Sequence, residues 1–164
     1  MWSGSSVAER FPCKELDEGA SPFSTFEGLM LMKSKMKPLW SSQSVHWSTP
    51  EGLYLELDKE FHFTYDPCPL DCKDLTKGLL QDWNGRVFIN PPYNNISNFL
   101  NKARLELKKG HIQLAVFLIP SRTDTKWWHA HAMKADTIRF IKGRLKFGGS
   151  RNSAPFPSCV VIYK

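Results

Sequence analysis

A short turn at residues 87–95, VFINPPYNN, carries side chains suited to chemistry on an amine. The apolar run ends at Asn90, Pro91 and Pro92 restrict the backbone, and an aromatic ring follows at Tyr93. The Asn90 side-chain oxygen and the Pro91 carbonyl can each accept one N–H from a planar group with an exocyclic amine. Tyr93 can stack on that ring. The alternative is a rigid turn in which the asparagine caps a helix and the tyrosine packs.

The nitrogen of such an amine is a weak nucleophile because its lone pair is delocalised into the ring. Two acceptors that draw the amine toward tetrahedral geometry partly restore its reactivity, and the other reactant must then be a strong electrophile. A strong base is not required, because the substituted ammonium product loses its proton readily to water or to a carbonyl. His46, His129 and His131 have no partner pattern, and we predict no catalytic role for them.

Helix and strand patterns alternate on both sides of this turn. Ser48 or Thr49 as a cap, with Pro50 and Glu51 after it, predicts a helix over about 50–58. Alternating apolar residues then predict a strand over 61–66, which ends at Asp66 because prolines follow. The later pattern predicts a strand over 86–89, a helix that Asn95 or Ser97 caps and Gly110 stops, and a buried strand over 112–120.

The C-terminal third predicts a helix within 121–135, capped by Thr123 or Asp124, and a strand over 137–141. Residues 143–164 predict a β-hairpin with a long loop and a second arm over 158–163. The fold class is therefore α/β, with a mostly parallel sheet and an antiparallel end. Residues 1–45 have no strong period and are interpreted as an irregular arm, and residues 46–164 as one domain.

Composition favours a soluble intracellular protein that binds a polyanion. The 164 residues suit a single domain, and 22 lysines and arginines against 16 acidic residues give a formal charge of +6. No signal-like apolar segment is present, so we expect a cytoplasmic location. The four cysteines lack zinc-ligand spacing, and we interpret them as thiols in a reducing compartment and predict no metal: Cys13, Cys68, Cys72 and Cys159.

Polar residues follow several predicted strands, where α/β sheets bind ligands. Asp66 and Asn90 occupy such positions. Three more residues follow the 112–120 strand, and either line a pocket or cap and solubilise a helix: Arg122, Asp124 and Lys126. Three basic residues of the hairpin either contact phosphates or form a solvated face: Arg144, Lys146 and Arg151. Trp127 and Trp128 are interpreted as packing residues.

From about Trp47 to the C-terminus, the ordered segments resemble the compact phage-type DNA N6-adenine methyltransferases, the phage Dam family. NPPY resembles the catalytic motif of S-adenosylmethionine-dependent amino methyltransferases, which transfer a sulfonium methyl group in line to nitrogen. The resemblance implies a compact Rossmann-like class I methyltransferase sheet and a flipped adenine held by the NPPY turn. It rests on HWSTPEGLYLELDKEFHFTYDPCPLD, LLQDWNGRVFINPPYNNISNFLNKA, LIPSRTDTKWWH, IRFIKGRLKF and APFPSCVVIY.

The resemblance also assigns residues. It implies that Asn90, Pro91, Pro92 and Tyr93 are catalytic, and that Trp47, Thr49, Pro50, Asp66, Pro67 and Cys68 contact the cofactor. The loop after Asp66 departs from the family pattern, since it has no glycine before Gly78. The interval from Asp66 to Asn90 is also shorter than the family's usual two strand-helix units, so Asp71, Asp74 or Asp82 is expected to replace the acid that they supply to the cofactor ribose.

Other functions fit the same residues. Cytosine N4, an RNA base or a glutamine amide can be served by the same turn. A nucleic-acid-binding module that has lost catalysis would explain the missing glycines. No separate recognition domain fits this length, so any sequence preference must come from the N-terminal arm, the hairpin loop or a second subunit. The protein is a monomer or a homodimer on this interpretation.

Overall fold

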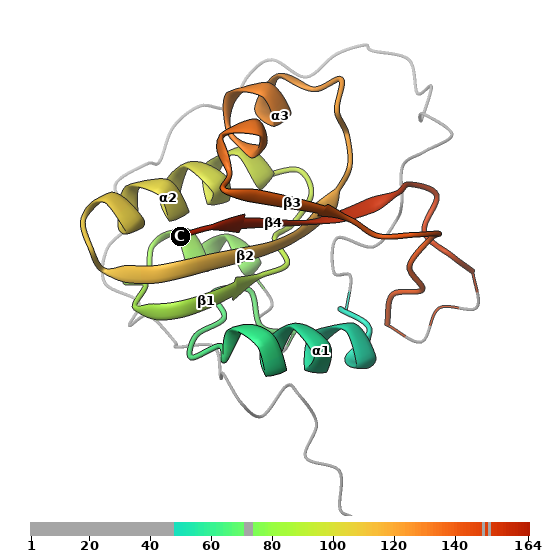
Figure 1. The fold of residues 1–164 in the computed structure, drawn as a ribbon, viewed down its shortest axis with the longest axis horizontal. Coiled ribbons are helices and arrows are strands. Elements are labelled where there is room, and N and C mark those ends of the chain that lie inside the picture. The colour runs from blue at the N-terminus through green and yellow to red at the C-terminus, as the bar shows by residue number, and fades with distance from the viewer. Residues whose placement is uncertain (1–47, 71–73, 149, 151) are drawn as a thin grey trace, which may run out of the picture.

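The computed structural model describes residues 48–70, 74–148, 150 and 152–164, and the remaining residues are drawn as a grey trace in Figure 1. Several predictions fall outside the described residues. These are the N-terminal arm at 1–45 and the assignments of Cys13, His46, Trp47, Asp71, Cys72 and Arg151.

One four-stranded sheet forms the centre of the described fold, in the order β1-β2-β4-β3. Its strands are β1 (Gly85–Ile89), β2 (Ile112–Pro120), β3 (Thr137–Phe140) and β4 (Ser158–Tyr163). β1 pairs parallel with β2, whereas β4 pairs antiparallel with both β2 and β3. The predicted α/β class is confirmed, but the sheet is mixed and not mostly parallel, because β4 lies between β2 and β3 (Figure 1).

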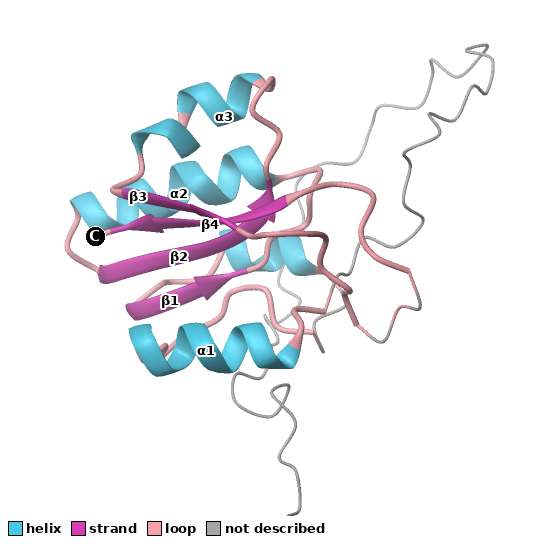
Figure 2. Ribbon diagram, turned by 45° about the vertical axis from the view of Figure 1, so that its right-hand side comes forward, coloured by secondary structure: helices cyan, strands magenta, loops and turns pink. Residues whose placement is uncertain are grey.

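Helices cover both faces of this sheet (Figure 2). They are α1 (Glu51–Phe61), α2 (Ile96–Lys108) and α3 (Lys126–Ala130), with 3-10 turns at η2 (Leu75–Leu79) and η3 (Ala132–Lys134). α1 begins where predicted and is longer than predicted. The predicted strand over 61–66 is wrong, because Phe61 completes α1 and only Tyr65 forms an isolated parallel bridge, to Val87. His62 ends the helix in a left-handed conformation, with φ 52°.

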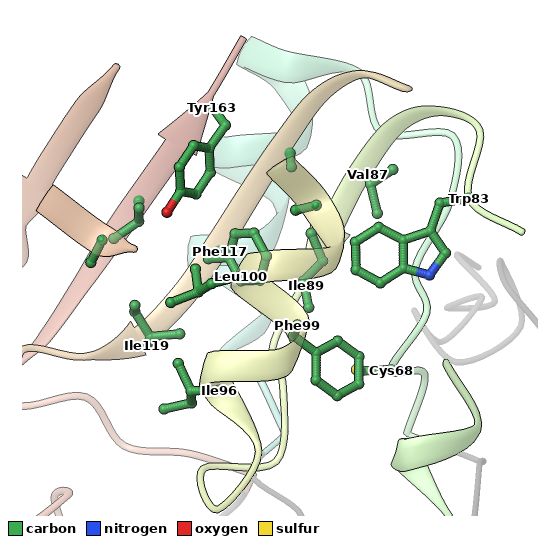
Figure 3. Close-up of a cluster of buried hydrophobic side chains, with 14 of the residues drawn as sticks. Cys68, Trp83, Val87, Ile89, Ile96, Phe99, Leu100, Phe117, Ile119 and Tyr163 are labelled. Atoms are coloured by element: carbon green, nitrogen blue, oxygen red, sulfur yellow. The ribbon is translucent and has the colours of Figure 1, made fainter. Parts of the chain in front are cut away.

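Two apolar clusters fill the two layers. One joins α2, α3 and η2 to the sheet, with Phe99, Leu100 and Phe117 at its centre (Figure 3). The other joins α1 to the opposite face through residues such as Leu57 and Val116. β2 contributes alternate residues to both clusters, which confirms the prediction of a strand buried on both faces.

The carboxyl ends of β1, β2 and β3 meet at one end of the sheet. Ile89 pairs with Phe117, and both Ile119 and Phe140 pair with Cys159, so these strands end at similar levels. The predicted hairpin is confirmed for its second arm, but its first arm is β3, which ends at Phe140. Residues 141–157 therefore form a long connection that starts and finishes at this end of the sheet (Figures 1 and 2). We call this region the carboxyl end of the sheet.

Candidate active site

Asn90 directly follows β1 and lies against the start of α1. Its Nδ2 donates a hydrogen bond to Oγ1 of Thr49 over 3.1 Å, and both residues are half-buried. The predicted capping role of Ser48 or Thr49 is wrong, because Pro50 occupies the N-cap position and no side chain caps α1. The Thr49 hydroxyl is instead used in a contact between residues 41 positions apart. Two predicted site residues, one assigned to the cofactor and one to catalysis, are thus in direct contact.

The two prolines after Asn90 are buried and close a turn into α2. The Pro92 carbonyl accepts a hydrogen bond from the N–H of Asn95 over 2.9 Å, and α2 begins at the next residue. Asn95 is the N-cap residue of α2, as one of the two predicted options, although its side chain makes no capping bond. The backbone of the turn is therefore fixed by β1 before it and by α2 after it.

Tyr93 packs against a residue that we did not predict to be functional. Its ring meets Phe156 edge-to-face, with ring centroids 5.3 Å apart and an interplanar angle of 81°. Burial raises the pKa of Tyr93 well above its usual range, and the charge of Arg122 acts in the opposite direction. The phenol is therefore protonated at neutral pH, and the Arg122 charge lies close to it. The only signal in the sequence for Phe156 was an aromatic residue between two prolines.

A group of acidic residues surrounds Tyr65, beside β1. The Tyr65 hydroxyl donates to Oε1 of Gln81 over 2.5 Å. Burial raises the pKa of Tyr65 to about 12, and the negative charges of Asp66 and Asp82 add to this effect. Asp66 is half-buried and Asp82 is exposed. Three residues predicted to bind the cofactor, Asp66, Cys68 and Asp82, therefore lie near Tyr65.

The loop after Asp66 is shaped by hydrogen bonds instead of glycines. Oδ1 of Asp66 accepts a hydrogen bond from the backbone N–H of Cys68 over 2.7 Å, which closes a tight turn. Cys68 is buried, and burial raises its thiol pKa well above the usual value, so the thiol is protonated. Asp74 has a local structural role, because its carboxylate caps η2 by accepting from the N–H of Thr76 over 3.0 Å.

Gly78 is the glycine that this loop requires, although it lies in η2. A Cβ atom at Gly78 would lie 2.1 Å from the carbonyl oxygen of Pro67, which is too close for two atoms that are not bonded to each other. The Gly78 carbonyl also accepts a hydrogen bond from Nε1 of the buried Trp83 over 2.8 Å. η2 therefore packs against Pro67 of the Asp66 loop on one side and is hydrogen-bonded to Trp83 on the other.

We predict that Gly78→Ala lowers the free energy of unfolding by about 1 to 3 kcal/mol, because the backbone must move to relieve the overlap with Pro67. Gly52→Ala is the matched control, since a Cβ atom there would have no neighbour within 4 Å and alanine favours a helix. Urea denaturation of both variants measures the effect. Equal stability of the two variants would contradict the close packing of η2 on the loop.

Polar residues follow β2 at the carboxyl end of the sheet, and the charge of one of them, Arg122, acts on Tyr93. Arg122, Asp124 and Lys126 are exposed, and the Arg122 carbonyl accepts from the N–H and the hydroxyl of Thr125 over 3.2 and 2.8 Å. Thr125 is the N-cap residue of α3, so the predicted caps Thr123 and Asp124 were wrong. The paired rings of the two tryptophans pack as predicted: Trp128 is buried and Trp127 is half-buried against the same cluster.

The 141–157 connection presents basic side chains while its backbone is anchored. Arg144 and Lys146 are exposed, but Phe147 is buried, with its ring centroid 6.3 Å from that of Phe156. The N–H of Gly148 donates to the carbonyl of Ser48 over 3.0 Å, and that of Ala154 to the carbonyl of Leu145 over 2.7 Å. The connection therefore reaches both the Thr49 segment and, through Phe156, Tyr93.

Sheet order explains how charge is distributed around Asn90. The Tyr65 bridge lies beside β1 on one side, and β2 lies beside it on the other. Asp66 and Asp82 therefore lie on the Tyr65 side of β1, and Arg122 follows β2 on the other side. Such an arrangement can hold a cationic ligand and a polyanion on opposite sides of one carboxamide.

Neither a metal centre nor a membrane span accompanies this site in the described part of the chain. Within residues 48–70, 74–148, 150 and 152–164, no group of three or more histidine, cysteine or acidic side chains could hold a metal ion. Across the same ranges, no helix is long and apolar enough to cross a membrane.

Comparison with known proteins gives one match. A family model described as DNA N-6-adenine-methyltransferase (Dam) matches residues 37–162, well over half of the chain. No curated protein and no solved structure matches the chain. The matched range includes Thr49, Asp66, the NPPY turn and the 141–157 connection. The chain therefore belongs to the DNA N-6-adenine-methyltransferase (Dam) family.

Proposed function

We propose that the protein transfers a methyl group from S-adenosylmethionine to N6 of adenine in DNA. The observation that carries this proposal is the Asn90 carboxamide, which a hydrogen bond to Thr49 holds directly after β1 at the carboxyl end of the sheet. Membership of the family supports the reaction, and the residues around Asn90 support the assignment of the site.

The acidic side suits the cofactor. S-adenosylmethionine bears a sulfonium, an ammonium and ribose hydroxyls, all of which favour carboxylate neighbours. Asp66 and Asp82 supply carboxylates beside Tyr65, and Thr49 lies next to Asn90. We infer that the cofactor contacts Thr49, Pro50, Asp66, Pro67, Cys68 and Asp82. When bound, it supplies an electrophilic methyl carbon.

The NPPY turn suits the target amine. The Asn90 side-chain oxygen and the Pro91 carbonyl accept the two N–H groups of N6, which directs the nitrogen lone pair along one line. The lone pair forms the new C–N bond as the C–S bond breaks, and the extra proton then leaves the nitrogen for water. Tyr93, with a protonated phenol, stacks on the base. Because N6 is paired inside a duplex, the adenine must be flipped out.

The basic residues suit the DNA backbone. Arg122, Lys126, Arg144 and Lys146 are exposed and lie on segments that follow β2 or β3. Phosphate contacts by such residues offset the few kcal/mol that base flipping costs. Asp124 lies between the basic residues Arg122 and Lys126 in the sequence. Its carboxylate would repel a phosphate, so it suits an uncharged part of the substrate.

We predict that Arg144→Gln with Lys146→Gln weakens DNA binding and lowers the slope of log affinity against log salt by about 2, since each phosphate contact contributes nearly one unit. Lys59→Gln with Lys108→Gln is the charge-matched control, because both lysines are exposed at the far ends of α1 and α2. Fluorescence anisotropy across a salt series measures both. An identical slope for the two double variants would remove the 141–157 connection from the DNA interface.

The fold supports the same assignment. Three strands in one direction, an inserted antiparallel strand and helices on both faces are compatible with a Rossmann-like methyltransferase domain over residues 46–164. DNA as substrate agrees with a cytoplasmic enzyme, in a host cell if the gene is phage-borne.

Mass spectrometry of nucleosides tests the proposed function. Purified protein is incubated with S-adenosylmethionine and with DNA, RNA or protein, and the DNA and RNA are digested. N6-methyldeoxyadenosine from DNA is the expected product. N4-methylcytosine, methylated RNA or a methylated glutamine would instead identify another nitrogen as the target. No product, together with no calorimetric heat on addition of the cofactor, would indicate a binding module without catalysis.

A further inference from the structure

We propose that Thr49 is a positioning residue, which orients the catalytic carboxamide of Asn90 through its side-chain hydroxyl. The inference rests on the proposed function, because it gives Asn90 the task of accepting an N–H from the target amine. It departs from the interpretation of Thr49 as a cofactor contact alone. Its basis is the hydrogen bond from Nδ2 of Asn90 to Oγ1 of Thr49.

The orientation of the carboxamide decides whether Asn90 can do this work. Rotation about the last side-chain bond exchanges the NH2 group, a donor, with the oxygen, an acceptor. An amine substrate needs the oxygen, and an NH2 group in its place would repel the N–H groups of the amine. With Nδ2 directed at Thr49, the oxygen is directed away from Thr49. In the observed orientation the Thr49 hydroxyl accepts from Nδ2, and this contact holds the carboxamide with its oxygen on the side that the amine would occupy.

Hydrogen bonds hold the backbone on both sides of Thr49. On one side, the N–H of Tyr54 donates to the carbonyl of Pro50 over 3.0 Å, which makes the residue after Thr49 part of the first turn of α1. On the other side, the carbonyl of Ser48 accepts from the N–H of Gly148 over 3.0 Å. A Cβ atom at Gly148 would lie 2.8 Å from Cβ of Ser48, so the two segments are in close contact. A functional group supported in this way keeps its geometry.

The usual structural explanation for a threonine at this position does not apply. A threonine just before a helix commonly caps it, but Pro50 occupies the N-cap position of α1 and no side chain caps the helix. Among the described contacts, the Thr49 hydroxyl is engaged with Asn90. Its removal should therefore affect turnover more than the stability of α1.

The same contacts connect Asn90 to the basic connection. Gly148 follows Lys146 and the buried Phe147, and its N–H donates a hydrogen bond to Ser48, the residue before Thr49. A change in the 141–157 connection on DNA binding would therefore reach Thr49 through one hydrogen bond and one residue. Thr49 stands between the segment suited to phosphate contacts and the atom suited to accept the amine.

The test compares Thr49→Val, which keeps the shape and removes the hydroxyl, with Thr49→Ser, which keeps the hydroxyl. We expect Thr49→Val to lower kcat about tenfold, as for the loss of one oriented hydrogen bond, with KM for DNA within about twofold of wild type. Thr49→Ser should restore kcat to within about threefold of wild type. An unchanged kcat in Thr49→Val, or a raised KM for the cofactor with unchanged kcat, overturns the proposal.

A second measurement does not depend on activity. The side-chain amide protons of Asn90, identified by their loss in Asn90→Ala, should exchange with water more slowly than those of the exposed Asn94. Exchange as fast as that of Asn94 overturns the proposal even if Thr49→Val does not fold. An inactive wild-type protein with slowly exchanging Asn90 protons would refute the proposed function and leave the contact intact, so the two failures are distinguishable.

Discussion

Asn90→Ala is expected to lower kcat for methyl transfer at least about a hundredfold, the cost of removing one group that acts directly on the reacting atoms. The affinity for S-adenosylmethionine should change by less than about twofold, because the acidic residues near Tyr65 remain in place. The physical reason is that alanine leaves the amine with a single acceptor, the Pro91 carbonyl, and its lone pair is no longer directed. Single-turnover kinetics and calorimetry on the same preparations measure the two quantities.

Asn94→Ala is the matched control for this variant. Asn94 lies four residues later in the same turn and is exposed, so its loss should leave both kcat and cofactor affinity near wild type. Retained turnover in Asn90→Ala would show that Asn90 does not accept the amine. A large loss in both variants would instead indicate that the whole turn is sensitive to substitution.

Local patterns were sufficient to predict much of the fold. β2 was predicted from an unbroken apolar run, and α2 from helical spacing with Gly110 at its end. The position of Asn90 at the carboxyl end of the sheet also followed, because prolines end β1 at a definite residue. These features depend on neighbours within a few residues, and the sequence displays such neighbours directly.

Features that depend on distant contacts were not predicted. The strand over 61–66 was wrong because Phe61 and Phe63 both face the core, which a helix end followed by an extended segment achieves as well as a strand does. The place of β4 between β2 and β3 is a matter of strand order, which no local pattern encodes.

The site shows the same limit. A threonine before Pro50 has the sequence pattern of a helix cap whether its hydroxyl bonds the helix or a residue 41 positions away. Likewise, Phe156 meets Tyr93 only because the 141–157 connection returns to the carboxyl end of the sheet. The NPPY turn can be located in the sequence, whereas its contacts with Thr49 and Phe156 were found only in the structure.

Asp66→Asn is expected to weaken the binding of S-adenosylmethionine by about ten- to a hundredfold, the range for a hydrogen bond that loses its charged partner. Asparagine keeps an oxygen that can accept the N–H of Cys68, so the turn after Asp66 should survive while its negative charge is removed. At saturating cofactor, kcat should stay within about threefold of wild type. The charge of Asp66 binds the cofactor about equally in the ground state and the transition state, so its loss raises KM and leaves kcat nearly unchanged. Calorimetry and initial rates across a cofactor series measure both effects.

Asp74→Asn is the control that isolates the position of the charge. Asp74 is exposed and caps η2, and asparagine caps a helix about as well as aspartate does, so cofactor binding should not change. Asp82→Asn tests the remaining candidate among the described residues, since the Asp82 charge also acts on Tyr65. A loss in Asp82→Asn as large as that in Asp66→Asn would mean that both carboxylates hold the cofactor. Equal affinity in Asp66→Asn and Asp74→Asn would mean that the acidic residues near Tyr65 do not bind it, and the cofactor would then have to lie elsewhere around Asn90.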